Sequence, residues 1–372
     1  MTIVDPQTAE MLRETVAKHC ERHADGATIR SSRGKVPGAV AVDVGTMAEL
    51  GWLAISVPES SGGLGLGIAA AGIVTEGLAG CYTSDPFVGL FLGARALVHA
   101  QAFEDLLALL AEGSATPVLA WQENDVDFAS PSPGTVYREG KVTGTKRWVV
   151  SAAEASHFII SAREDGQDIL VIVEASSSGI HLAHTQRADG TPLGRLTLDS
   201  VPCEIIARGS EAQRVLRRTL DEGTVLVAAE LMGHVDRMMA LVLDHLKTRK
   251  QFGKIIGSFQ ALQHRASSMF VHQRLARSVL TMTLAEADQI SDPLEFGQRA
   301  ARLRARLNDT TQLIMRESIQ LFGAMGITDE NELSLHIKRC LSLLPYLGNS
   351  TEQRRYWTSL FARSVRTGAA TK

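Results

Sequence analysis

The chain has 372 residues, of which 45% are hydrophobic and 21% are charged, and its formal net charge is -3. This length exceeds what one simple core usually takes, so two or three packed subdomains are expected. The composition excludes extended disorder. The near-neutral charge gives no global basic surface, and no apolar run reaches the ~20 residues of a transmembrane helix, so neither a nucleic acid partner nor membrane insertion is expected.

Residues 1–116 are predicted to form an N-terminal helical domain. Apolar positions recur at helical spacing over residues 7–20 and 44–50, and residues 68–110 are rich in Ala, Leu and Gly. Residues 51–67 hold too many glycines for a helix, so we expect a loop there. The glycines alone are weak evidence for a phosphate cradle, because no P-loop Lys-Ser/Thr follows them.

Residues 117–208 have the pattern of a small all-β domain. Short segments rich in β-branched and aromatic residues are separated by Gly, Pro, Ser and Asp. No interval between them holds a helix long enough for a parallel crossover, so an antiparallel barrel or sandwich is preferred to a Rossmann unit. The predicted strands lie at residues 118–121, 147–150, 158–161, 169–173 and 180–182.

Residues 209–372 return to helical periodicity, and several of the predicted helices are long and amphipathic. Helices of this length and apolar density usually pack antiparallel into a four-helix bundle, and their broad apolar faces often serve subunit contact as well. The candidate helices lie near residues 211–247, 260–290, 292–321 and 333–344.

The four cysteines, Cys20, Cys81, Cys203 and Cys340, lie far apart and form no CxxC pair. This spacing argues against both a disulfide framework and a zinc site, so no metal is expected. The acidic start of the chain has no apolar core and does not fit a secretory signal. A reduced cytoplasm is the expected location, with each cysteine serving as a small buried apolar residue.

A polar turn at residues 249–253 interrupts the helical pattern of the C-terminal region. It carries Arg249 and Phe252, and Gln260 follows shortly after. A guanidinium donates in a planar fork that matches a diphosphate, so this set suits an anionic, ring-bearing cofactor. The alternatives are that Arg249 is a solvated cation at a helix end and that Phe252 packs in the core.

Four landmarks, in sequence order, resemble the acyl-CoA dehydrogenase family over essentially the whole chain. Residues 51–67 resemble its "GW…PEE.GG.G" segment, residues 143–150 its "GxKxWIT" strand, and residues 320–327 its "QxxGGxGY" segment. Residues 249–265 resemble the arm that reaches across a dimer to the FAD of the partner. Four ordered matches are stronger than any one of them.

The resemblance implies a mainly α fold with a central all-β domain, between an N-terminal helical domain and a C-terminal four-helix bundle. Residues 246–265 are especially similar to the small subunits of two-subunit bacterial enzymes. Those enzymes include pimeloyl-CoA dehydrogenases and actinobacterial enzymes acting on CoA thioesters of steroid side chains. The implied partners are a larger subunit in a heterotetramer, an acyl-CoA substrate and an electron-transfer flavoprotein as acceptor.

The resemblance also assigns roles toward FAD. Arg249 would contact the diphosphate of a partner's FAD, Phe252 would lie against the adenosine side, and Gln260 would make a polar contact. Gln320 and Gly323 would form a second edge of the same site, although an ordinary helix end closed by glycine is the alternative. Trp148 matches the tryptophan that packs against the flavin ring, whereas an aromatic residue in a strand is more often part of the core.

Several positions depart from the family pattern. Val150 stands where a threonine commonly contacts the flavin, and Ala324 replaces the usual second glycine. Residues 120–127 occupy the place of the "TEPxxGSD" loop but keep only Glu123 of its core. Because an unpaired buried ligand oxygen costs on the order of 1–3 kcal/mol, the flavin site of this chain itself is expected to bind weakly.

The catalytic base is also missing from its usual place. Desaturation needs a carboxylate in a dry pocket to remove the α-proton, but the family spacing places the base position at Leu347. Some members carry the base on the first helix of the bundle, and that position is Gly223. The neighbouring Glu222 is a candidate only if the register shifts, and otherwise it is an acid in a first helical turn. Glu230 is a weaker candidate, with a buried structural acid as its alternative.

Three hypotheses follow. The chain is a subunit of a flavin-dependent acyl-CoA dehydrogenase that lends its arm to a larger, catalytically complete subunit. Alternatively, it is a homotetrameric dehydrogenase with Glu222 or Glu230 as base, or a scaffold subunit with no flavin role.

Overall fold

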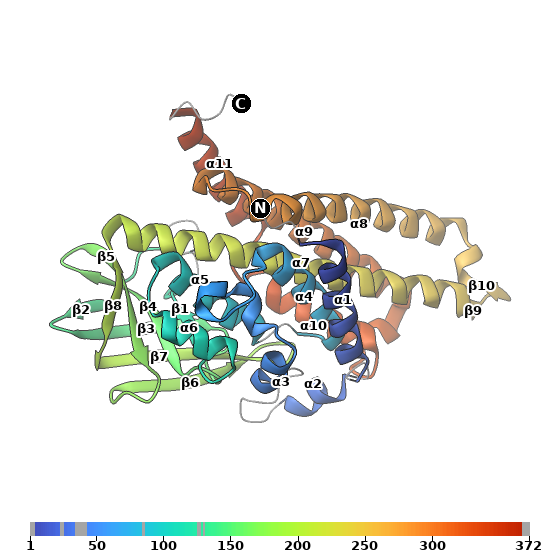
Figure 1. The fold of residues 1–372 in the computed structure, drawn as a ribbon. Helices are drawn as coiled ribbons and strands as arrows, with labels where there is room; N and C mark the ends of the chain where they lie inside the picture. Colours follow the sequence, from blue (N-terminus) through green and yellow to red (C-terminus); the bar gives the residue numbers. More distant parts are fainter. Residues whose placement is uncertain are drawn as a thin grey trace.

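The computed structural model describes residues 4–22, 26–33, 43–83, 86–124, 128 and 131–366, which form three regions along the chain (Figure 1). The first is helical. Aspartate 5 caps the first helix through its carboxylate, which accepts from the backbone N–H groups of Gln7 and Thr8, and Pro6 occupies the first helical position. The helices are α1 (Pro6–Glu21), α2 (Ala27–Ser32), α3 (Val44–Glu49), α4 (Gly67–Gly77), α5 (Phe87–Ala100) and α6 (Glu104–Ala111), joined in part by the 3₁₀ helices Leu53–Ser56, Glu59–Ser61 and Leu78–Cys81.

Helix α5 packs directly against the first strand of the sheet, and Gly93 makes this approach possible. A Cβ atom at Gly93 would lie only 1.9 Å from the carbonyl oxygen of Pro117, so no larger residue fits there. Because a helix and a strand can meet backbone to backbone only through such a residue, Gly93 fixes how the N-terminal helices cover the β region.

The second region is a single eight-stranded sheet in which neighbouring strands run in the order β6-β7-β3-β2-β4-β5-β8, with β1 paired to β4. Pairing is antiparallel except for the parallel pairs β1 with β4 and β2 with β4. The predicted β domain is confirmed, but the strands at 136–138, 192–202 and 204–208 were not among the predicted ones. The strands are β1 (Pro117–Ala120), β2 (Val136–Arg138), β3 (Lys141–Val149), β4 (His157–Glu164), β5 (Gln167–Glu174), β6 (Ile180–Gln186), β7 (Pro192–Pro202) and β8 (Glu204–Arg208).

The third region is a bundle of long helices. Helix α7 (Gly209–Thr248) has 40 residues, and its middle is buried between the N-terminal helices and helix α9 (Pro293–Phe322). Helix α8 (Gln260–Ala287) lies on the outside of the bundle (Figure 1), and only five of its residues are buried. Helix α10 (Glu332–Leu343) and helix α11 (Ser350–Arg366), which was not predicted, complete the region. Within the described part of the chain, no helix combines the length and the apolarity needed to cross a membrane.

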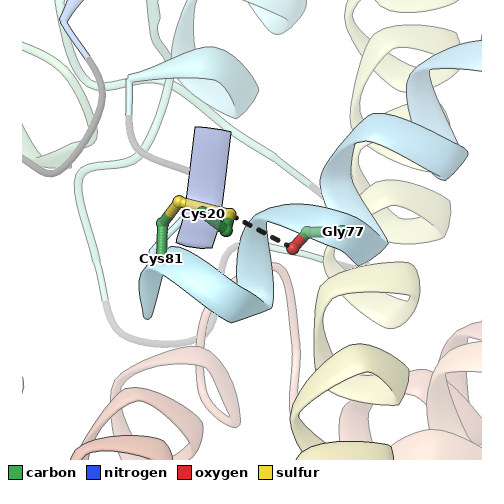
Figure 2. The surroundings of a disulfide bond; sticks show 3 residues. All are labelled: Cys20, Gly77 and Cys81. Carbon is green, nitrogen blue, oxygen red and sulfur yellow. Dashed lines mark hydrogen bonds between the residues drawn. A yellow bond between two sulfur atoms is a disulfide. The ribbon is translucent and has the colours of Figure 1, made fainter. Parts of the chain in front are cut away.

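The structure corrects the expectation for two of the cysteines, because Cys20 and Cys81 form a disulfide (Figure 2). Their Cα atoms are 5.0 Å apart although the residues are 61 positions apart in sequence. The bond joins α1 to the 3₁₀ helix Leu78–Cys81, and the Cys20 sulfur lies 3.6 Å from the carbonyl oxygen of Gly77. Spacing alone missed the pair because the chain between them folds back on itself. The other cysteines are free: Cys340 is buried and Cys203 is half-buried.

Candidate functional site

The arm predicted at residues 249–260 is a short hairpin at the end of α7. Strand β9 (Lys250–Gln251) pairs with β10 (Lys254–Ile255) across a two-residue turn made by Phe252 and Gly253. Both turn residues have positive φ, 52° and 77°, as a tight hairpin turn of this kind requires. The Phe252 side chain is 89% exposed, which excludes the alternative that it packs in the core of this chain.

Contacts within the arm restrict the position of the exposed Phe252 ring. Phe259 meets Phe252 edge to face with ring centroids 6.1 Å apart, and the Lys254 ammonium lies 4.3 Å from the Phe259 ring centroid. The backbone N–H of Ile256 donates to the carbonyl of Arg249 at 2.9 Å. The hairpin therefore presents an aromatic ring to solvent at a defined position.

The polar side chains of the arm are free to bind a ligand. Arg249 and Gln260 are exposed, and neither side chain makes a hydrogen bond or an ion pair with any residue that the structure describes. Arg249 is the C-cap of α7, where the partial negative charge of the helix end also favours a cation. An exposed guanidinium next to an exposed ring fits an anionic, ring-bearing group.

The predicted second edge lies at the end of α9. Gln320 is exposed near the end of this helix, and Gly323 closes it with φ 64°. The helix-capping role foreseen as the alternative for Gly323 is therefore real, and it leaves the glycine exposed and open to a ligand as well. A Cβ atom at Gly323 would meet nothing within 4 Å.

Gly223 and Leu347, the two positions that the resemblance predicts for a catalytic base, lie side by side and are apolar. A Cβ atom at Gly223 would lie 3.0 Å from Cδ1 of Leu347 and 2.6 Å from Cδ2 of Leu92. Leu347 and Leu92 are both buried. On the other side, Phe128 packs against Gly348, where an added Cβ would lie 3.1 Å from the ring. Apolar side chains therefore surround both predicted base positions.

Glu222 points into an ion-pair cluster instead. It lies in the interior of α7 and not in a first turn, which corrects the alternative given for it. Its carboxylate accepts from Arg95 Nε at 2.7 Å and Arg218 Nε at 2.9 Å, and His99 Nε2 lies 2.9 Å away. Burial alone would raise the pKa of Glu222, but Arg95 and His99 outweigh burial and hold that pKa well below its ordinary value. A fully buried carboxylate bound by three basic groups is poorly suited to accept a substrate proton.

Glu230 is likewise a buried structural acid. Arg339 donates from Nε to its carboxylate at 2.6 Å and from Nη1 to Asp189 at 2.9 Å. Burial opposes ionisation, but Arg339 and His234 together lower the pKa of Glu230 below its ordinary value. This arrangement favours the structural alternative stated for Glu230.

In the β region, the partly buried Glu123 belongs to a hydrogen-bond network with residues of β3 and β4. It accepts from the N–H groups of Gly134 and Thr135 at 2.6 and 3.1 Å, and it pairs with Lys146, which is fully buried. Burial raises the pKa of Glu123, but Lys146 and the hydrogen bonds outweigh it, so the pKa stays below its ordinary value. Lys146 also donates to Ser161 at 3.0 Å. Positions 125–127 of the loop lie outside the described residues.

Trp148 stands at an irregularity in β3. The register between β3 and β7 shifts between Lys146 and Val149, and Trp148 there has φ 53°. Its ring is half-buried, and the Arg147 guanidinium lies 5.9 Å from the ring centroid. Val150 is buried and offers no hydrogen-bond donor from its side chain.

A cavity that the sequence did not reveal lies between the sheet, α7 and α11. Its volume is about 650 Å³, and its walls include Arg214, Arg217, Arg218 and Tyr356. The Arg217 guanidinium lies 4.4 Å from the ring centroids of both Phe128 and Tyr356, and Nη1 donates to the Phe128 carbonyl at 2.6 Å. The only sequence feature that pointed to this cavity was the pair Arg217 and Arg218, four residues before Asp221 and Glu222. Opposite charges at this spacing are common on any helix.

Two family models and a curated relative decide the family. The acyl-CoA dehydrogenase N-terminal domain matches residues 6–103, and the acyl-CoA dehydrogenase C-terminal domain matches residues 213–357. Acyl-CoA dehydrogenase IpdE2 of Mycobacterium tuberculosis is 31% identical over 344 residues, which cover 90% of this chain and 91% of that protein. The chain belongs to the acyl-CoA dehydrogenase family. Members of this family are FAD-dependent oxidoreductases.

Solved structures agree with this acyl-CoA dehydrogenase fold. A variant of the Tcur3481-Tcur3483 steroid ACAD is similar with a TM-score of 0.86 at 24% identity, covering 97% of this chain and 99% of that one. The ChsE4-ChsE5 complex of Mycobacterium tuberculosis is similar with a TM-score of 0.82 at 19% identity, covering 98% and 99%. The predicted mainly α fold with a central β domain is thereby confirmed.

Proposed function

We propose that this chain is the arm-donating subunit of a heteromeric acyl-CoA dehydrogenase that introduces an α,β double bond into an acyl-CoA thioester. The FAD would be housed mainly in the partner subunit, and its chemistry there would be to take up hydride from the β-carbon of the substrate. Arg249 of this chain would hold the diphosphate with its fork of donors, Phe252 would lie against the adenosine side, and Gln260 would add a polar contact. Gln320 and Gly323 border the same site.

The observation that carries this proposal is the distance between the arm and the base position of the same chain. Arg249 stands 26 positions after Gly223 on the α7 axis, which corresponds to roughly 39 Å at the rise of an α-helix. In Figure 1 the hairpin projects from the end of α7 that lies away from the β region. An exposed arm this far from the predicted base position of its own chain is suited to a site on another subunit.

The base positions support a partner that supplies the chemistry. The surroundings of Gly223 are apolar, because the side chains of Leu92 and Leu347 pack against it. These residues offer no proton acceptor there. Glu123 and Lys146 form an ion pair with each other. These residues do not fit a catalytic flavin site within this chain, and the α-proton then passes to a base of the partner subunit.

The outer surface of α8 supports the existence of a partner. This helix carries large exposed apolar side chains, at 46% to 56% exposure, and an uncovered apolar face of this kind indicates a subunit contact. These side chains are Phe270, Val271, Leu275 and Met282. Two of the similar solved structures are named for two components each, the Tcur3481-Tcur3483 steroid ACAD and the ChsE4-ChsE5 complex. By analogy with these names we propose a heterotetramer and a substrate with a steroid side chain. The resemblance stated above adds a dicarboxylic acyl group as the alternative substrate and an electron-transfer flavoprotein as the acceptor.

The deciding experiment measures flavin per chain for the chain alone and for the chain purified together with the products of its neighbouring genes. We expect little FAD in the isolated chain and one FAD per two chains, with dehydrogenase activity, in the complex. In that complex Arg249→Ala releases FAD, whereas the exposed control Arg13→Ala on α1 does not.

The alternatives give different results. A homotetrameric enzyme retains about one FAD per chain and turns over acyl-CoA without a partner. A scaffold subunit forms the complex, but Arg249→Ala leaves FAD binding unaltered. The first result would overturn the heteromeric assembly, and the second would overturn the proposed role of the arm.

A further inference from the structure

A stacked pair of rings joins the two segments that are proposed to meet the partner's FAD. The imidazole of His245 lies face to face with the ring of Phe322, with centroids 4.3 Å apart and an angle of 14° between the planes. His245 is one helical turn before Arg249, and the Arg249 N–H donates to its carbonyl at 3.0 Å. Phe322 is the last residue of α9 and precedes Gly323.

The electrostatics of the pair favour this stack at neutral pH. The imidazole of His245 is partly buried. This burial and the nearby charge of Arg249 both lower the pKa of His245. His245 is therefore neutral near pH 7, so its ring packs on Phe322 as an aromatic partner and Arg249 remains the cation that faces solvent. The ordinary contribution of such a pair is about 0.5–1.5 kcal/mol beyond the area it buries.

The arm has internal braces, but these do not fix its position relative to α9. The Phe252–Phe259 contact, the Lys254–Phe259 contact and the Ile256-to-Arg249 hydrogen bond all lie within residues 249–259. The His245–Phe322 stack differs because its two residues are 77 positions apart in the sequence and belong to different helices.

From this geometry we infer that His245 is a positioning residue whose stack on Phe322 sets Arg249 at a fixed place relative to Gln320 and Gly323. The inference rests on the proposed function, in which these groups contact one cofactor. A ligand that bridges two segments binds more tightly when their separation is fixed beforehand, because less conformational freedom is lost on binding.

The test compares His245→Ala with His245→Phe in the complex with the partner subunit. The rate of FAD dissociation is followed by the rise of flavin fluorescence after dilution. Loss of the stack in His245→Ala should speed dissociation roughly two- to tenfold, the effect that corresponds to an aromatic pair. His245→Phe keeps a flat ring and should restore the rate, and His181→Ala on β6 is the matched control.

A second readout needs no flavin. Amide hydrogen exchange over residues 249–259 of the isolated chain should be faster in His245→Ala than in the wild type, and His245→Phe should return it to the wild-type rate. A role that depends on the hydrogen bonding or the charge of the imidazole would not be rescued by phenylalanine.

The outcomes separate this inference from the proposed function. If Arg249→Ala releases FAD while His245→Ala leaves dissociation and exchange unchanged, the arm role stands and the role of His245 is wrong. If His245→Phe behaves like His245→Ala, stacking is not the cause. If Arg249→Ala does not change FAD binding, the proposed function fails. The positioning role is then judged by amide exchange alone, and unaltered exchange in His245→Ala would show that it is wrong.

Discussion

At the scale of single residues, one position along α7 separates Glu222 from Gly223, the position that the resemblance predicts for a base. Successive residues of a helix differ in direction by about 100°. Gly223 faces Leu92 and Leu347, whereas Glu222 faces Arg95, His99 and Arg218. The presence of a glutamate next to the expected position therefore says little about catalysis.

Replacing Glu222 tests this interpretation. Glu222→Gln removes a fully buried carboxylate and leaves two partly buried guanidinium groups without their counter-charge, so we expect the free energy of unfolding to fall by about 3 kcal/mol. Turnover per folded complex should stay close to that of the wild type. Chemical denaturation and steady-state kinetics on the same preparation measure the two effects.

The matched control is Glu211→Gln, because Glu211 makes an exposed ion pair with Arg214 near the start of the same helix. It should alter stability by no more than roughly 1 kcal/mol. A Glu222→Gln variant that keeps its stability but loses turnover by orders of magnitude would identify Glu222 as the base.

At the scale of elements, the disulfide ties α1 to the turn that follows α4. A Cβ atom at Gly77 would lie 2.6 Å from a methyl carbon of Val16, so α1 and α4 are also in close contact beside the bond. The close packing explains how two cysteines that are distant in sequence come within bonding distance.

Removal of the disulfide should destabilise the chain. For a closed loop of 61 residues the chain-entropy estimate is about 4 kcal/mol. We expect both a reductant and the double change Cys20→Ala with Cys81→Ala to lower the thermal midpoint, with Cys203→Ala as control. Titration of thiols in denaturant without reductant should find two free cysteines, and a count of four would show that the bond is absent.

At the scale of the whole molecule, a buried polar cluster joins all three regions. Asp189 comes from the β6–β7 turn, Glu230 and His234 from α7, and Arg339 with His336 from α10. The two imidazoles meet through their Nδ1 atoms at 2.9 Å, and Tyr82 of the N-terminal region packs on His336 with ring centroids 5.0 Å apart. Because each region contributes, protonation of this cluster affects the stability of the entire fold.

This cluster predicts a loss of stability in mild acid. Burial, together with the charges of His234 and Arg237, outweighs the attraction of Glu332 and lowers the pKa of His336 to about 4. The unfolded chain takes up this proton near pH 6.5, so the free energy of unfolding should fall as the pH is lowered from 6.5 toward 4. Urea denaturation at pH 7 and pH 5 measures the difference.

His336→Phe removes the titrating group while keeping a ring against Tyr82. The difference in unfolding free energy between pH 7 and pH 5 should shrink in this variant, and His181→Phe on the exposed face of β6 should leave it unchanged. An undiminished difference in His336→Phe would mean that His336 titrates normally in the folded chain.

Much of this protein can be predicted from its sequence because the relevant signals are local. Helical periodicity, short β-branched segments and the Arg249 turn depend on neighbours a few residues apart, so the order of regions and the existence of the arm were predictable. The absence of an acid at Leu347 needed only the family spacing.

Tertiary structure decided which distant residues meet. Three contacts join residues that the sequence pattern cannot relate. They are the Cys20–Cys81 bond, the apolar contact among Leu92, Gly223 and Leu347, and the His245–Phe322 stack. Periodicity gives the face of a helix that is buried but not the residue opposite it, because that depends on how whole helices pack. Phe252 is a further example. The sequence determined that an aromatic residue lies in the turn after α7, and the fold determined that its side chain is exposed to solvent.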